Sequence, residues 1–134
     1  MNAKLEQLKY HPYHQYLGVV DIVNENNSVE LHANVSENTI NFSGVYHGGA
    51  IYSLCDVCAY ASLVSSLENN QEAVTHDIHV SLLRPVVENE RVIYKSTIRK
   101  LGRSLCFIDV EVTANGKLIA TARVTKSIVI KIES

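Results

Sequence analysis

The sequence has no tryptophan, only two prolines and three cysteines among its 134 residues. A small, odd number of cysteines argues against a disulfide framework and favours a reducing, cytoplasmic location. Clusters of lysine and arginine are also missing, and the net charge is −2, which argues against nucleic acid as the main partner. No apolar run approaches the ~18–20 residues of a membrane span, and the polar N-terminus has no signal-peptide core. We therefore expect neither a nucleic-acid nor a membrane partner.

The composition that remains is typical of a globular protein. Hydrophobic residues make up 46% of the chain and charged residues 19%, which is too apolar for a disordered protein. No linker, internal repeat or low-complexity segment divides the chain. The sequence therefore predicts a single domain over residues 1–134, large enough to bury a hydrophobic core.

The order of predicted helices and strands indicates an α+β fold. Residues 2–10 have helical spacing and Pro12 should end that helix, while residues 17–23 and 29–35 favour strands. Residues 47–67 contain no proline and carry small apolar side chains on most sides, which predicts a long buried helix. We expect this helix to be wrapped by an antiparallel sheet of about six strands. Four of these strands should form a meander, at residues 74–83, 92–101, 105–113 and 118–130.

Two local patterns refine the predicted strands. In the first strand after the helix, Ile78 and Leu82 share one face, so Thr75 should lie on the opposite face. Asn115 and Gly116 are a strong signal for a type I′ hairpin before the last strand.

His47, Gly48 and Gly49 stand where the long helix should begin. Each glycine costs a helix about 1 kcal/mol relative to alanine, so something must compensate. Unobstructed N–H groups at a helix N-terminus can bind an anion or a developing oxyanion. Close packing of the helix start against a strand would also explain the glycines, and spacing alone does not separate the two explanations.

Asp56 is the only acidic residue between Glu37 and Glu68, and it lies in the middle of the predicted helix. An acid among apolar neighbours is usually paired or functional. A structural explanation, such as a partner arginine or a cap on a neighbouring loop, stays open. The functional explanation is a general base or a nucleophile.

Helix geometry separates His47 from Asp56. Nine residues at ~1.5 Å each place them ~13 Å apart along the axis, and ~100° per residue places them on opposite sides. They cannot act on one carbonyl within a single chain. If both are catalytic, two antiparallel copies of the helix must bring Gly48 of one chain near Asp56 of the other, which predicts a two-fold homodimer.

A nine-residue motif and a spaced acid resemble the N-x-x-G-x-x-H-G-G…L-x-D signature of hotdog-fold acyl-CoA thioesterases. They are the run NFSGVYHGG at residues 41–49 and the run LCD at residues 54–56. The phenylacetic-acid-degradation type is the most similar, and the likeness covers roughly residues 15–131. The resemblance implies a hotdog fold, an acyl-CoA substrate, and a homodimer or dimer of dimers with sites across the interface. It implies no cofactor and no metal.

The resemblance also implies roles for individual residues. Asp56 matches the catalytic acid, Gly48 matches the oxyanion donor, and Asn41 matches the asparagine that helps hold the carbonyl or the water. His47 matches a histidine with a supporting role. Thr75 falls where the family often has a hydroxyl that orients the nucleophilic water.

A second group of residues is predicted to contact the substrate. Its basic members are candidates for the phosphates of coenzyme A, and solvated surface charge is the alternative explanation for each of them. The predicted substrate contacts are Gly49, Arg84, Lys100, Gly102, Arg103 and Ser104.

Two other functions compete with thioester hydrolysis. A hydratase of the same fold would carry a D-x4-H signature, but Ala61 stands five residues after Asp56. A non-catalytic acyl-CoA-binding protein is the second alternative, although binding alone does not need Asp56 together with Gly48. The sequence therefore predicts an acyl-CoA thioesterase that acts on a small to medium or aromatic acyl group.

Overall fold

The computed structural model describes residues 3–25 and 28–132. Helices α1, α2 and α3 lie at Ala3–Tyr10, Pro12–Tyr16 and Gly48–Leu63, with short 3-10 turns at Glu37–Thr39 and Val64–Ser66. Strands β1 to β6 lie at Val19–Glu25, Ser28–Asn34, Gln71–Leu82, Arg91–Leu101, Leu105–Ala114 and Lys117–Ile130. Asn2 of the predicted first helix and residues 26–27 of the predicted β1–β2 turn lie outside the described residues.

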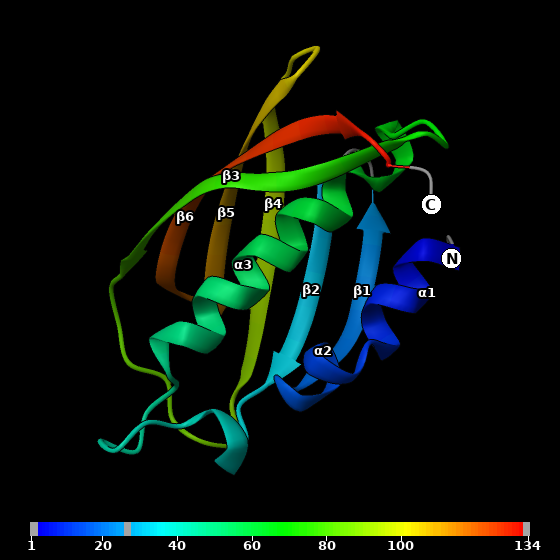
Figure 1. Ribbon diagram of the computed structural model, residues 1–134. Coiled ribbons are helices and arrows are strands. Elements are labelled where there is room, and N and C mark those ends of the chain that lie inside the picture. Colours follow the sequence, from blue (N-terminus) through cyan, green and yellow to red (C-terminus); the bar gives the residue numbers. More distant parts are fainter. Residues whose placement is uncertain (1–2, 26–27, 133–134) are drawn as a thin grey trace.

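The six strands form one antiparallel sheet in the order β1-β2-β4-β5-β6-β3. The sheet curves around α3, as Figure 1 shows, so the predicted arrangement of one long helix and an antiparallel sheet is confirmed. The Asn115-Gly116 hairpin is also present, with both residues at positive φ.

The predicted four-strand meander is wrong in one respect. Only β4, β5 and β6 follow one another, whereas β3 pairs with β6 at the far edge of the sheet. The connection from β3 to β4 is held by the loop before α3, where Tyr46 N–H donates to Val86 O at 2.7 Å. Val45 also bridges to Val87. These contacts hold the β3–β4 connection beside the start of α3. After this connection, β4 pairs with β2 and not with β3.

Pro12 begins a second helix and does not simply end the first. It occupies the first turn of α2, where a missing N–H leaves no helical hydrogen bond unmade. The imidazole of His11 caps this helix, because its Nδ1 accepts a hydrogen bond from Tyr13 N–H at 3.2 Å. The two short helices pack beside β1 (Figure 1).

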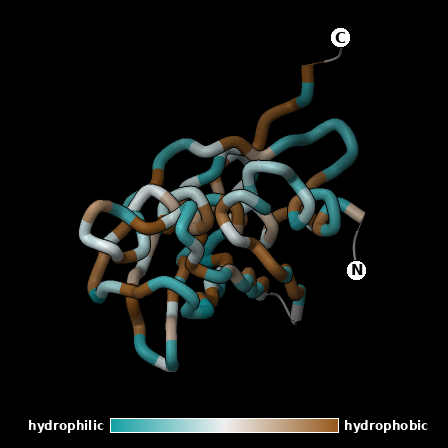
Figure 2. Tube along the Cα trace, turned by 90° about the horizontal axis from the view of Figure 1, so that it is seen from below, coloured by the Kyte–Doolittle hydropathy of each residue, from teal (hydrophilic) through white to brown (hydrophobic). Residues whose placement is uncertain are grey.

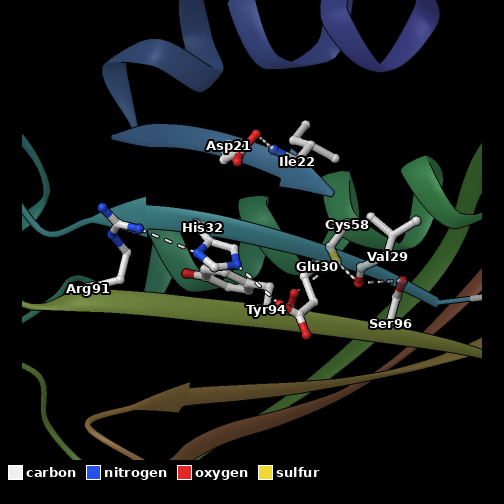
Figure 3. A network of polar contacts seen from close by, with 9 residues as sticks. All are labelled: Asp21, Ile22, Val29, Glu30, His32, Cys58, Arg91, Tyr94 and Ser96. Carbon is white, nitrogen blue, oxygen red and sulfur yellow. Dashed lines mark hydrogen bonds and ion pairs between the residues drawn. The ribbon is translucent and has the colours of Figure 1, made fainter. Parts of the chain in front are cut away.

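Helix α3 lies close to the sheet because many of its buried side chains are small. Cys58, fully buried, directs its Sγ to the carbonyl oxygens of Val29 and Tyr94 on β2 and β4, at 3.6 and 3.5 Å (Figure 3). Burial raises the pKa of the Cys58 thiol to about 12. An inert thiol in this position supports a packing role for the cysteines of α3.

The segment Gly48–Ser66 is long and apolar enough to cross a membrane by length and composition, in contrast to the expectation that no run approaches that limit. The sheet covers one side of this helix, and a core helix passes the same test. Hydrophobic residues also occur near the end of the described residues (brown in Figure 2), where Ile130 and Ile132 are exposed.

A bulge in β3 changes which side chains face the helix. Thr75 pairs with Lys126 of β6 and Asp77 pairs with Thr125, so His76 is an extra residue without a partner in the ladder. Thr75 therefore faces α3, on the same side as Ile78, which packs against the core. The predicted strict alternation, with Thr75 opposite Ile78, is wrong because the bulge shifts the register by one residue.

Candidate active site

The start of α3 presents one free amide. His47 caps the helix with an extended backbone, and its Nδ1 accepts a hydrogen bond from Gly49 N–H at 2.9 Å. The accepting Nδ1 carries no proton, so the proton of the neutral imidazole lies on Nε2. The N–H of Gly48 makes no hydrogen bond with any described residue. Gly48 thus offers the donor that the sequence assigned to this position, whereas the Gly49 amide is already engaged.

Packing accounts for the two glycines only in part. A Cβ at Gly48 would approach Leu82 Cδ1 to 3.0 Å, and a Cβ at Gly49 would approach His47 Nδ1 to 3.2 Å. Leu82 is half exposed and its methyl is the end of a flexible side chain, so it can move. Close packing against β3 is present, but it does not by itself require glycine at position 48.

The loop before α3 is ordered by Asn41. Its Oδ1 accepts hydrogen bonds from the N–H groups of Ser43 at 2.9 Å and Val45 at 3.2 Å. Its backbone N–H donates to Val45 O at 2.8 Å. Because the loop occupies Oδ1, the Nδ2 amide group of Asn41 is the part of the side chain left to donate to a ligand.

A groove of about 290 Å³ joins Asn41 to the free amide of Gly48. Arg84 lies in the same groove, so the structure brings this predicted substrate contact to the predicted oxyanion donor. Tyr46 also lines it, but its hydroxyl bonds Tyr94 at 2.7 Å in the core, and burial raises the pKa of Tyr46 to about 12. The complete lining is Asn41, Val45, Tyr46, Gly48, Ile51, Leu82, Leu83, Arg84 and Pro85.

Asp56 lies on the exposed side of α3 and bonds two residues of the sheet. Its Oδ1 accepts from the Thr75 hydroxyl at 2.7 Å and from Lys126 Nζ at 2.8 Å. Lys126 Nζ also donates to Thr75 Oγ1 at 2.9 Å, which closes a triangle of hydrogen bonds. The Lys126 side chain is 3% exposed and that of Asp56 is 37% exposed. Asp56 is therefore both paired and open to solvent.

Sequence reasoning missed Lys126 and considered an arginine as the structural partner of Asp56. The one available signal was a lysine inside a strand, two residues from both Val124 and Ile128 and therefore on the same strand face as these apolar residues. This signal could not be connected to Asp56, because the meander placed the last strand away from Thr75. The observed β3–β6 pairing sets Thr75 directly opposite Lys126.

The two groups of predicted catalytic residues lie apart in one chain. Asp56 does not line the groove at Gly48, and no hydrogen bond joins the two within the described residues. Eight residues of α3 separate them, or ~12 Å along the helix axis. The separation derived from helix geometry is therefore present in the structure.

Comparison with known proteins identifies the family to which these features belong. A profile described as Thioesterase superfamily matches residues 43–121, which include the His47–Gly49 helix start, Asp56 and Thr75. The chain belongs to the thioesterase superfamily. The described fold agrees with that of a thioesterase from Haemophilus influenzae, with a TM-score of 0.88 and 26% identity over 99% of this chain and 95% of that one. The hotdog fold is thereby confirmed.

Two further relatives indicate which type of thioesterase the chain resembles. Phenylacetic acid degradation protein PaaI from Thermus thermophilus, solved as a mutant, has a TM-score of 0.76 and 25% identity, with 87% of this chain and 97% of that chain covered. Human acyl-coenzyme A thioesterase 13 is 32% identical over 69% of this chain, and the match spans 66% of that relative's length. The resemblance to thioesterases of the phenylacetic-acid-degradation type is confirmed.

In this thioesterase-superfamily chain, the predicted substrate contacts fall into two places. Gly102 and Arg103 line a hollow of about 280 Å³ at the C-terminal end of α3, far from the groove that contains Arg84. Lys100, near the end of β4, and Ser104, in the turn before β5, are exposed beside it. A larger hollow, of about 640 Å³, also lies near this end and contains none of the predicted catalytic residues.

The part of the chain that the structure describes contains no cluster of metal ligands. Within residues 3–25 and 28–132, no group of three or more histidine, cysteine, aspartate or glutamate side chains could hold a metal ion. The three cysteines are all buried and unpaired.

Proposed function

We propose that this chain hydrolyses acyl-CoA thioesters, with Asp56 and the Gly48 amide as its two reactive groups. The observation that carries the proposal is the pairing of a solvent-open carboxylate with an unengaged helix N-terminal amide in a thioesterase fold. The relative named acyl-coenzyme A thioesterase 13 supports coenzyme A as the leaving group. We also propose that the protein is cytoplasmic and uses no cofactor.

The chemistry requires only groups that the chain supplies. Gly48 N–H donates to the carbonyl oxygen as negative charge develops on it, and Asn41 Nδ2 helps to hold that oxygen or the attacking water. As a general base, Asp56 takes a proton from water while the water oxygen attacks the carbonyl carbon. The C–S bond then breaks, and coenzyme A leaves as the thiolate, which takes up the proton. As a nucleophile, Asp56 would form a mixed anhydride that water then cleaves.

The separation of Gly48 and Asp56 supports a site shared between two chains. The β3 strand, with twelve residues, forms one edge of the sheet and leaves most of its side chains exposed, including Val74 and Leu82. An exposed edge strand of this length can pair with another copy across a two-fold axis. Such a homodimer would place α3 helices antiparallel and bring Gly48 of one copy towards Asp56 of the other. A dimer of dimers is compatible with this unit.

The first experiment measures free thiol released from a panel of acyl-CoAs that spans short, medium and aromatic acyl groups. The wild type should release coenzyme A from at least one of them. Asp56→Asn should lower kcat by about 100-fold or more, because the amide is neither a base nor a nucleophile. Glu88→Gln, which changes an exposed acid in the β3–β4 loop, is the control. Acyl-CoA binding without thiol release from any of the panel would favour the non-catalytic binding protein.

Mixing two inactive variants tests the shared site. Asp56→Asn and Gly48→Pro subunits are inactive alone, because each homodimer lacks one of the two groups at both sites. A mixed dimer contains one intact site, formed by Asp56 of the second variant and Gly48 of the first. Random re-association should therefore restore about one quarter of wild-type activity. No restoration after verified subunit exchange would show that each chain contains its own complete site.

A further inference from the structure

Lys126 is the one buried cation that contacts a predicted catalytic residue, among the residues that the structure describes. Its side chain is 3% exposed, and its ammonium lies 2.8 Å from Asp56 Oδ1 and 2.9 Å from Thr75 Oγ1. The ring of Tyr60, one turn after Asp56 on α3, faces the ammonium with its centroid at 5.6 Å. The ammonium charge of Lys126 is thus enclosed on three sides, by Asp56, Thr75 and Tyr60.

Each wall of this enclosure is itself fixed. Tyr60 donates its hydroxyl to Glu72 Oε1 at 2.6 Å, which holds the ring in place. Thr75 donates to Asp56 Oδ1 and accepts from Lys126, so both hydrogen-bonding functions of its hydroxyl are used. The pairing of Thr75 with Lys126 in the β3–β6 ladder sets the two side chains beside each other. The enclosure is therefore a rigid part of the fold.

The two carboxylate oxygens of Asp56 differ in their hydrogen-bond partners in the enclosure. Both donors, Thr75 and Lys126, bond Oδ1, and Oδ2 makes no hydrogen bond with any described residue. The carboxylate is still 37% exposed. A charged donor and a neutral donor on Oδ1 fix the rotation of the carboxylate, so the lone pairs of Oδ2 are directed away from the enclosure.

We propose that Lys126 is a positioning residue, which anchors Oδ1 of Asp56 so that Oδ2 is the oxygen that meets the water or the thioester. The inference rests on the proposed function for its kinetic consequence. Its structural part, the coupling of Asp56 to Lys126, does not depend on any activity. A buried ammonium also needs its counter-ion, so Asp56 and Lys126 stabilise each other's position.

The kinetic test compares Lys126→Met with the wild type on the best acyl-CoA of the panel. Loss of the anchor should lower kcat by about 100-fold while KM changes by less than about threefold, because a misdirected carboxylate affects the reacting step and not binding. Lys95→Met, which removes an exposed lysine from β4, is the matched control and should leave both constants unchanged. A Lys126→Met enzyme with kcat within about threefold of wild type would overturn the proposal.

Chemical rescue separates positioning by charge from packing. In Lys126→Ala, n-propylammonium can replace the missing chain and its charge, whereas n-propanol replaces only the volume. We expect kcat to rise with the concentration of the ammonium and not with that of the alcohol. Equal rescue by both compounds, or rescue by neither in a folded dimer, would overturn the role of the charge.

A stability cycle tests the coupling without any substrate. Urea midpoints are measured for Asp56→Asn, Lys126→Met and the double variant. Asp56→Asn leaves the ammonium without its counter-ion and should lower the midpoint, whereas the double variant should recover most of that loss and remain inactive. Additive changes would contradict the coupling. If the wild type hydrolyses nothing in the panel but the cycle shows coupling, the proposed function fails while the Asp56–Lys126 pair stands.

Discussion

The start and the middle of α3 contribute one reactive group each, and they are built by different means. At the start, Gly48 offers a backbone amide whose position depends on the helix and on the loop before it. In the middle, Asp56 offers a side chain whose position depends on β3 and β6. The Gly48 amide is positioned by residues next to it in the chain, although its groove also includes residues 82–85. Asp56 depends on strands that are distant in the chain. A change in the core sheet should therefore affect the Asp56 half and leave the Gly48 half intact.

The largest effect is expected from Gly48→Pro compared with Gly48→Ala. Proline removes the N–H but suits the first position of a helix, and the extended backbone of His47, with ψ of 132°, suits a residue before proline. Alanine adds the same Cβ and keeps the N–H. We expect proline to lower kcat by about 100-fold to 1000-fold and alanine to have a much smaller effect. Circular dichroism and gel filtration confirm the fold. Equal losses in the two variants would mean that shape at position 48 matters and the amide does not.

A smaller effect is expected from Thr75→Val in the other half. Valine keeps the shape of the side chain but removes the hydroxyl that joins Asp56 to Lys126, so each of these groups loses one partner. We expect a loss of about 1–2 kcal/mol in the free energy of unfolding, together with a fall in kcat.

Thr75→Ser is the control for this prediction, since it keeps the hydroxyl. The readouts are urea denaturation and initial rates under the same buffer conditions. An unchanged rate in Thr75→Val would show that the Thr75 hydroxyl does not contribute to the reacting step.

His47→Ala should have a modest effect that is confined to the start of α3. It removes the cap on Gly49 N–H, which should cost about 1 kcal/mol in the free energy of unfolding. His47→Asn, which supplies another capping acceptor, should retain most of the stability. Urea denaturation measures both variants, and an undiminished free energy of unfolding in His47→Ala would show that the imidazole contributes nothing as a cap.

The smallest effect concerns His14, which belongs to neither half. Burial lowers the pKa of His14 from its usual 6.5, against a raising contribution from its hydrogen bond to Leu8, and nearby His11 lowers it further. The unfolded chain then binds a proton at a higher pH than the folded chain does. The stability is complete above about pH 6.5 and falls as the pH drops through the lowered value.

Urea midpoints across neutral to acidic pH test this expectation, with His14→Gln as the variant that cannot titrate. Its midpoint should depend less on pH than that of the wild type. If the two pH dependences coincide, protonation of His14 does not destabilise the fold, and another group must account for any acid lability.

The features that sequence predicted best are those set by neighbours in the chain. The His47–Gly49 helix start, the apolar run of α3 and the Asn115-Gly116 hairpin all follow from short-range rules, and each is present. Pro12 was misjudged, because a proline ends one helix and begins another equally well.

The features that sequence could not supply depend on which strands pair. Lys126 becomes a neighbour of Asp56 only because β3 lies at the edge beside β6. Thr75 faces α3 only because His76 is an extra residue in the ladder, and no alternation of polar and apolar residues reveals such a bulge. Long-range strand pairing and a one-residue register shift together determine which residues surround Asp56 in the candidate site.

The apolar character of α3 has a consequence for synthesis on the ribosome. Four of the six strands follow α3 in the chain, and these include β4, against which α3 packs. While those strands are still being translated, a helix of membrane-like hydropathy is covered mainly by β2 and α1. A nascent chain in this state exposes hydrophobic surface and is prone to aggregate or to engage chaperones. The helix that aligns the two halves of the site is thus also the segment that makes the unfinished chain most vulnerable.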